Sequence, residues 1–284
     1  ITGLIGLSVV VLLSACGGEK SSSPSVSQEL SSKIDLGENL FSDTNLSLNR
    51  SQSCASCHDP DHAFVDSRQD SDGLSGAVSV GDDGVSIGDR NAQTAAYAQF
   101  SPDFHYGDRP RFNSQESDYS GFLGGQFHDG RELDLAGQAE GPPTNPLEMG
   151  MPDRASVVDR VLENEAYKSA FESLFGADLF ADVDAAYAAI AECIAEFEGT
   201  GQFAEFDSKY DRSLVGEASL SLKEAFGKAL FFSQTNTNCA TCHQLRVNGH
   251  KQELFTSFEY HNIGVPINHA VRDLNGASLD EGLL

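Results

Sequence analysis

Two five-residue motifs carry the clearest chemical signal in this sequence. They read Cys54-Ala55-Ser56-Cys57-His58 and Cys239-Ala240-Thr241-Cys242-His243, and both fit the pattern C-x-x-C-H. Two thiols at this spacing can bond the two vinyl groups of one haem, and the histidine that follows can supply the axial nitrogen to its iron. We therefore predict two covalently attached haem c groups, with Cys54, Cys57 and His58 holding one and Cys239, Cys242 and His243 holding the other.

Other uses of a C-x-x-C pair are zinc binding and dithiol redox chemistry. A structural zinc ion needs a closed set of four ligands, whereas each motif offers three. Two complete motifs in one chain therefore favour haem. Of the two remaining cysteines, Cys193 lies in an Ala-rich helical segment and is expected to be a buried apolar residue.

The other remaining cysteine, Cys16, ends an apolar N-terminal stretch. Residues 1–15 carry no charge and have the length of a signal-peptide core, which is short for a membrane span. The tetrapeptide Leu13-Ser14-Ala15-Cys16 resembles a bacterial lipobox, with an ordinary cleaved signal as the alternative. We expect residues 1–16 to be an export signal that begins upstream of this sequence, and residues 17–30 to be a flexible tether. A periplasmic protein with a lipid anchor follows from this interpretation.

The balance of charge excludes one class of partner. The chain has 43 acidic against 18 basic side chains and a formal net charge of -25. Nucleic acid binding requires a basic surface that neutralises phosphates, so no nucleic acid partner is expected. The acidic surface either attracts basic partner proteins or is only a solvated exterior.

The two motifs belong to a repeated unit. Residues 37–42 and 227–233 each form a short helical stretch that ends in a Leu-Phe pair before a loop and the motif. Ser221 and Glu224 form a candidate capping box for the second stretch.

Periodicity completes the outline of the fold. Helical spacing of apolar residues predicts helices over 154–175, 182–199 and 219–232, residues 66–125 are expected to form long loops, and no strand pattern is evident. The fold class predicted is mainly α, with two cytochrome c-like haem domains over 31–205 and 206–284.

An ordered set of motifs resembles the bacterial di-haem cytochrome c peroxidase family, which includes MauG-type enzymes. The resemblance runs from about Leu36 to the end of the chain. Besides the two haem motifs, its members here are Leu36-Gly37, Leu40-Phe41, Arg90-Asn91-Ala92-Gln93-Thr94, Phe127-His128-Asp129-Gly130-Arg131, Gln138, Asn145-Pro146-Leu147-Glu148-Met149 and Tyr260-His261-Asn262-Ile263-Gly264.

This resemblance implies a peroxidatic first haem and an electron-transfer second haem. In the family a Gln and a Glu line the distal pocket of the first haem, and the matching positions are Gln138 and Glu148. A carboxylate there can move a proton between the two peroxide oxygens, and an amide can hold the bound peroxide. The family also places a calcium ion between the haems, near the position of Asn91.

Two departures from the family pattern bear on the chemistry. Classical members carry a histidine in the loop after the first motif that caps the resting iron, but residues 74–88 contain none, and His62 is too close to His58 to reach the opposite face. We therefore predict a first haem with an open distal position. The second departure is His128, which stands where the family has a tryptophan between the haems; it either bridges them for electron transfer or only packs there.

A third departure concerns the second haem, because the chain is expected to be truncated before its family distal ligand, a Met or a Tyr. Met149 and Met151 flank Glu148 and are not expected to bind this iron. His250, His261 and His269 are candidates, with a surface or hydrogen-bonding role as the more ordinary interpretation of each.

The function predicted is the reduction of hydrogen peroxide to water, with electrons from a small c-type cytochrome or cupredoxin. A MauG-type oxidant of a protein side chain and a non-catalytic di-haem electron carrier are the alternatives. Membrane association is expected only through the lipid anchor, and homodimer formation is left open.

Overall fold

The computed structural model describes residues 30–68, 77–111, 116–245, 252–276 and 279–283. The predicted signal over residues 1–16, nearly all of the predicted tether, residues 74–76 of the predicted loop and His250 lie outside the described residues. The helices are α1 (Lys33–Ser42), α2 (Cys54–Cys57), α3 (Leu135–Thr144), α4 (Arg154–Leu162), α5 (Glu165–Phe175), α6 (Val183–Glu198), α7 (Lys209–Leu214), α8 (Leu222–Phe231) and α9 (His269–Asn275), and the strands are β1 (His105–Arg109) and β2 (Tyr119–Leu123).

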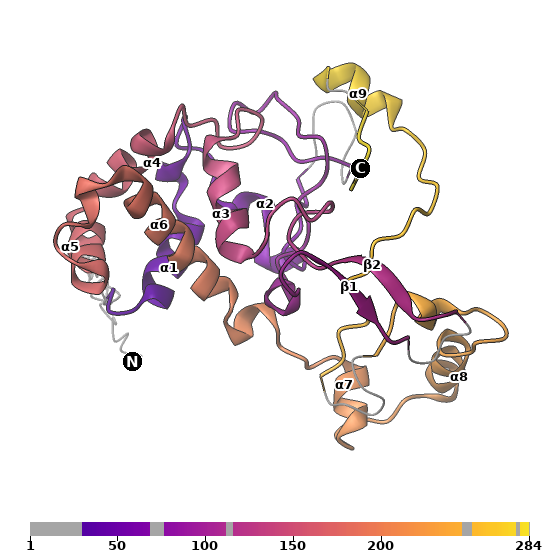
Figure 1. Ribbon diagram of the computed structural model, residues 1–284. Helices are drawn as coiled ribbons and strands as arrows, with labels where there is room; N and C mark the ends of the chain where they lie inside the picture. The colour runs from indigo at the N-terminus through magenta and orange to yellow at the C-terminus, as the bar shows by residue number, and fades with distance from the viewer. Residues whose placement is uncertain (1–29, 69–76, 112–115, 246–251, 277–278, 284) are drawn as a thin grey trace, which may run out of the picture.

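The main hydrophobic core lies around α6 (Figure 1). This helix buries Tyr187, Ile190, Ile194 and Phe197, whose spacing follows the helical period, and Cys193 is fully buried as expected. Helices α1, α3 and α4 pack against it. Full burial of one such apolar side chain contributes about 1.5–3 kcal/mol, so this cluster is the main source of stability in the first part of the chain.

Gly37 explains why a glycine stands in the first helix of the repeat. Helix α1 crosses α6 so closely that a Cβ at Gly37 would clash with the backbone carbonyl of Cys193 and would lie 2.8 Å from Cβ of Phe197. Backbone atoms cannot move aside cheaply. The glycine is therefore required by the contact between two helices and not by its own backbone conformation.

Gly37→Ala is expected to destabilise the protein by about 1–3 kcal/mol, because the helices must separate to admit the methyl group. The measurement is the free energy of unfolding in urea. Gly227→Ala is the matched control at the repeated position, where an added Cβ meets nothing within 4 Å in the described structure. Equal stability of the two variants would contradict the packing argument.

The helix predicted over 154–175 is wrong in one respect, because it is two helices. Helix α4 ends at Leu162, and the side chain of Asn164 accepts a hydrogen bond from Ala166 N to begin α5. Asparagine favours such caps because its side chain competes with the helical backbone. The predicted helix over 182–199 is confirmed as α6, and that over 219–232 as α8, with the capping box of Ser221 and Glu224 formed.

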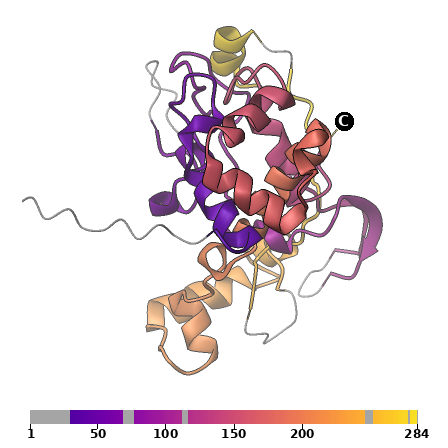
Figure 2. The same cartoon turned by 90° about the vertical axis from the view of Figure 1, so that its left-hand side faces the viewer.

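The expectation of no strand is also wrong. Strands β1 and β2 pair antiparallel, with His105 opposite Leu123 and Arg109 opposite Tyr119. Gly107 faces Gly121 at the centre of the ladder, and glycine weakens the alternating pattern by which a strand is recognised. The hairpin projects from the bundle around α6 in both views (Figures 1 and 2).

Helices α7 and α8 stand apart from the bundle in both views (Figures 1 and 2). None of the side chains of α8 is buried among the described residues, and Leu222 and Phe226 are 92% and 65% exposed. The chain then returns to the first part of the molecule, where Val271 of α9 packs with Val78 and Ile87. The mainly helical class is confirmed, and the proposed boundary near residue 205 stays a prediction.

A search of the described helices for one long and apolar enough to cross a membrane finds none.

Candidate functional site

The first C-x-x-C-H motif forms a single helical turn, α2, which brings both thiols to one cavity. Ser53 and Ser56 form a capping box at its start, and the backbone N–H of His58 donates to Cys54 O at 2.8 Å. Cys54, Cys57 and His58 all line the same cavity. This is the arrangement required if two thioether bonds and one axial ligand are to reach a single haem.

The imidazole of His58 is fixed by a backbone carbonyl. Its Nδ1 lies 3.1 Å from the carbonyl oxygen of Phe64. Since a carbonyl only accepts, Nδ1 carries the proton and Nε2 keeps a free lone pair for iron. Burial lowers the pKa of His58, which also favours the neutral ligand form.

The second motif reproduces this geometry. Nδ1 of His243 lies 3.0 Å from Phe255 O. Phe64 and Phe255 both have left-handed backbones, with φ of 56° and 54°. Such a conformation is costly for a bulky residue, so its recurrence at both sites marks a functional constraint.

The phenylalanine of each Leu-Phe pair also occupies equivalent positions. The ring centroid of Phe41 lies 6.4 Å from that of His58, and the ring centroid of Phe231 lies 5.8 Å from that of His243. The repeat seen in the sequence is therefore a structural repeat. The accepting carbonyls of Phe64 and Phe255 had no sequence signal, because every residue type supplies a carbonyl.

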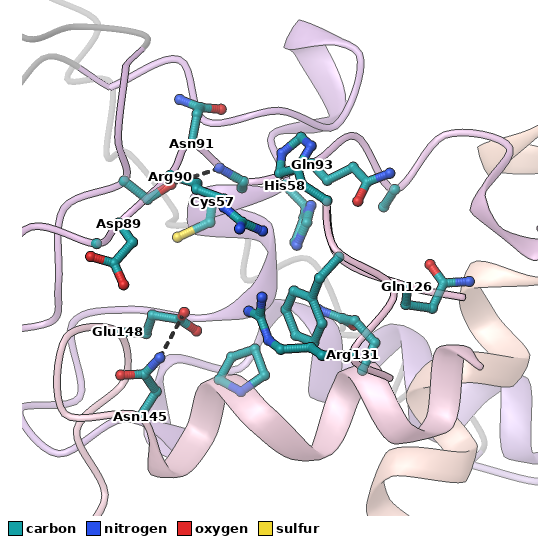
Figure 3. A pocket seen from close by; sticks show the side chains of 18 of the residues that line it. Cys57, His58, Asp89, Arg90, Asn91, Gln93, Gln126, Arg131, Asn145 and Glu148 are labelled. Carbon is teal, nitrogen blue, oxygen red and sulfur yellow. Dashed lines mark hydrogen bonds between the residues drawn. The ribbon is translucent and has the colours of Figure 1, made fainter. Parts of the chain in front are cut away.

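A cavity of about 500 Å³ opens beside the first motif. Figure 3 shows His58 reaching into it from one side and Glu148 facing it from another. Its volume falls within the ~300–1,000 Å³ typical of cofactor sites. The two thiols, the oriented imidazole and the cavity together fit a covalently bound haem.

Glu148 is held in place by its own loop. Asn145 Nδ2 donates to Glu148 Oε1 at 2.9 Å, and Glu148 O accepts from Asp82 N at 2.7 Å. Burial raises the pKa of Glu148, against the opposing effects of Arg131 and Asn145. Arg131 also lines the cavity, where its guanidinium stacks 3.7 Å from the ring centroid of Phe127. The sequence assigned no role to Asn145 or Arg131.

Gln138 lines the same cavity and lies on α3, a helix that the periodicity of the sequence did not indicate. Asp134 caps this helix by accepting from Gly137 N, and Pro142 and Pro143 lie inside its last turn. Prolines near the end of a helix remove backbone donors and so weaken the helical signal of the sequence.

The remaining predicted residues of the first site lie as follows. His128 lines the cavity with an exposed side chain, and partial desolvation there lowers its pKa. Asn91 also lines it, and its Nδ2 donates to Asp66 O at 3.2 Å. Among the described residues no cluster of three or more His, Cys, Asp or Glu could hold a metal ion, so calcium near Asn91 stays a prediction. His62 points elsewhere and pairs with Asp59 at 2.7 Å.

The residues considered as ligands of the second haem lie in different parts of the structure. Met149 and Met151 are buried in the core of the first part of the chain, as expected for residues that do not bind the second iron. Nε2 of His261 lies 3.0 Å from Glu259 Oε2. His269 begins α9, which packs on the first part of the chain.

A segment from the end of the chain also reaches the first cavity. Asp280 lines it and accepts from Arg90 Nε at 2.6 Å. Arg272 of α9 pairs with Asp89 at 2.7 Å. These ion pairs join residues almost two hundred positions apart, and no local pattern could have indicated them.

Comparison with known proteins agrees with this geometry. The profile of the family described as di-haem cytochrome c peroxidase matches residues 31–219. The chain belongs to the di-haem cytochrome c peroxidase family. Family membership implies two haem c groups, which the two repeated motifs fit.

Two curated relatives represent both branches of the family. The methylamine utilization protein MauG of Paracoccus denitrificans is 47% identical over 88% of this chain and 62% of its own length. The cytochrome c peroxidase Ccp of Escherichia coli is 30% identical over 74% of this chain and 37% of its own length. The chain thus spans about three-fifths or less of these relatives.

A solved structure shows the same architecture. The di-haem peroxidase BthA of Burkholderia thailandensis superposes with a TM-score of 0.78 at 30% identity, over 88% of this chain and 59% of that one. This match confirms the predicted fold class, a mainly helical protein with cytochrome c-like haem domains.

Proposed function

We propose that this protein reduces hydrogen peroxide to water at the haem bound by Cys54, Cys57 and His58. The observation that carries the proposal is the partly buried carboxyl of Glu148, fixed by Asn145 and facing the cavity into which His58 points. The iron supplies electrons to the bound peroxide, and the protein supplies the proton transfer. The whole reaction consumes one peroxide, two electrons and two protons and yields two waters.

The role of Glu148 is to move a proton. As a base it takes the proton from the peroxide oxygen nearer the iron, and as an acid it returns that proton to the departing oxygen. Gln138 donates a hydrogen bond to the bound peroxide from α3. The charge of Arg131 lowers the pKa of Glu148 and so works against the effect of its burial.

Access of peroxide requires an open position opposite His58. Among the described residues that line the cavity, the histidines are His58 and His128, and none comes from residues 77–88. The proposal therefore includes a first haem that reacts without prior release of a capping histidine. A haem held by Cys239, Cys242 and His243 would receive electrons from a small c-type cytochrome or cupredoxin, and His128, which lines the first cavity, is our candidate for electron transfer between the haems.

A second candidate function is the oxidation of a protein side chain, as in MauG-type enzymes. The relative at 47% identity is a MauG, which favours this alternative. Both functions use the same first site and the same reaction with peroxide. They differ in the source of the two electrons, which is a small redox protein in one case and a protein substrate in the other.

The setting of the reaction is also proposed. Export to the periplasm agrees with covalent haem and with the apolar residues 1–15, and lipid attachment at Cys16 stays a prediction. Calcium near Asn91 and homodimer formation are likewise predictions.

Rapid mixing of the haem-loaded protein with hydrogen peroxide tests the proposal. We expect a high-spin first haem before mixing and a fast shift of the Soret band afterwards. A reduced small c-type cytochrome should then be oxidised catalytically. Two low-spin haems whose spectra do not change when peroxide is added would instead indicate an electron carrier. A peroxide reaction without turnover of the cytochrome would favour the side-chain oxidase.

A further inference from the structure

Glu198 is a buried carboxyl that the proposed peroxide chemistry does not use. It is the last residue of α6, it lines the cavity of the first motif, and it is only 4% exposed. Ile194, one turn earlier, lines the same cavity. The side chain therefore faces the haem site from the helix at the centre of the hydrophobic core.

The surroundings of Glu198 favour its neutral form. Burial raises the pKa of Glu198 to about 8, and burial is the sole cause of that shift. The C-terminal end of a helix also carries partial negative charge, which opposes a carboxylate there. An ionisable side chain kept in so unfavourable a place is a candidate for function.

Charged neighbours do not compensate for this burial. The ionisable groups on the helices packed against α6 are Lys33, Asp35 and Glu38 of α1, Glu140 of α3, and Arg154, Asp159 and Arg160 of α4. The charged groups that line the cavity are Asp89, Arg90, Asp129, Arg131, Glu148, Arg272, Asp280 and Glu281. None of these groups contributes to the pKa shift of Glu198, so its carboxyl is electrostatically isolated from them.

One feature of the haem site does lie close to Glu198. Burial, and after it the charge of Glu198, raises the pKa of the Cys54 thiol. Glu198 and the sulfur that would bond the haem line the same cavity. A charge at this place acts on the haem through a medium of low dielectric constant, where electrostatic effects are large.

We propose that Glu198 is the redox-linked proton site of the first haem. When one electron from an external reductant converts the iron from Fe(III) to Fe(II), the fraction of Glu198 that is still ionised would take a proton from solvent and would release it on reoxidation. The added electron repels a nearby carboxylate, so reduction must raise the affinity of Glu198 for the proton. The charge inside the cavity then stays constant as electrons arrive, which lowers the cost of reduction.

This inference needs the haem at Cys54 and Cys57 but not the peroxide activity. Its test is a redox titration followed by visible absorption, at a series of pH values, on the haem-loaded protein without peroxide. In the unaltered protein the midpoint potential of the first haem should fall as pH rises, over roughly one pH unit on either side of the pKa of Glu198. The sign follows because protons are bound on reduction and are scarcer at higher pH.

Glu198→Gln should remove this pH dependence. Glu196→Gln is the matched control, because it deletes the same charge two residues away on the exposed side of α6 and should leave the dependence unchanged. A pH dependence that persists in Glu198→Gln would overturn the proposal. If it is lost instead in Glu148→Gln, the redox-linked proton belongs to Glu148.

The free energy of unfolding, measured as a function of pH, shows whether Glu198→Gln is correctly folded. Because the pKa of Glu198 is raised in the folded state, the folded protein binds more protons than the unfolded chain between the ordinary glutamate value and about pH 8. The contribution of Glu198 to stability must then fall as pH rises through this range. Glu198→Gln should lack this fall and should be at least as stable as the unaltered protein at pH 8, whereas a lower stability there would count against an isolated buried carboxyl.

Discussion

Replacing Glu148 with glutamine is expected to slow the reaction of the first haem with hydrogen peroxide by about 10²–10⁴-fold, the range typical of a lost general acid/base. Glutamine keeps the shape of the side chain and can still pair with Asn145, but it cannot accept a proton from peroxide. The effect should therefore fall on the rate of the chemical step. The measurement is the second-order rate constant of the Soret shift in rapid mixing.

The pH profile makes this prediction specific. Glu148 must be ionised to act as the base, so the rate should fall as pH drops through its pKa. Burial raises that pKa, which places the acid limb above the ordinary glutamate range. Glu148→Gln should lose the limb as well as the rate. Glu196→Gln, which alters an exposed carboxyl, should keep both, and an unchanged rate in Glu148→Gln would refute the assigned role.

Replacing Arg111 with methionine is expected to cost about 3–5 kcal/mol, the range seen when one partner of a buried ion pair is removed. Arg111 Nη2 lies 2.8 Å from Glu259 Oε2, and the side chains are 10% and 0% exposed. The pair joins the segment after β1 to residues 257–261, beside the bridge between Leu123 and Glu259. Without Arg111, the Glu259 carboxylate would be left buried with His261 as its remaining partner.

Unfolding in urea, together with hydrogen exchange of the hairpin, measures this effect. Arg50→Met is the control, because Arg50 makes a bidentate ion pair with Glu163 in which both side chains are 48% exposed. An exposed pair of this kind contributes about 0–1 kcal/mol. Adding Glu259→Gln to Arg111→Met should recover part of the lost stability, because it removes the uncompensated charge. Similar losses of unfolding free energy for Arg111→Met and Arg50→Met would show that burial does not increase the contribution of the ion pair to stability.

The sequence was informative wherever the chemistry depends on residue type at short spacing. Two C-x-x-C-H motifs, the glycine and Leu-Phe pair before each of them, and the capping box at Ser221 are local patterns, and each has a direct physical meaning. The family followed from the order of several such patterns. Helix α6 was evident because apolar residues recur at helical spacing along its length.

Errors arose where local patterns conflict with packing. Asn164 divides one predicted helix into two, the prolines at the end of α3 hid the helix that carries Gln138, and the glycines of the hairpin hid its two strands. The cap at Asn164 is local, whereas α3 is held against α6 and the hairpin is bridged to Glu259, so contacts with other parts of the chain override weak local preference there. Such contacts are absent from any short stretch of sequence.

The site itself was decided mainly by tertiary structure. The C-x-x-C-H motif named His58, and the family resemblance named Gln138 and Glu148. The cavity that they share exists only because α2, α3 and the loop that ends in Glu148 are folded around the same core. The carbonyl of Phe64 that orients His58 has no residue signature at all. The same holds for Glu198, whose sequence position marks an ordinary helical glutamate, because its burial comes entirely from the helices packed around α6.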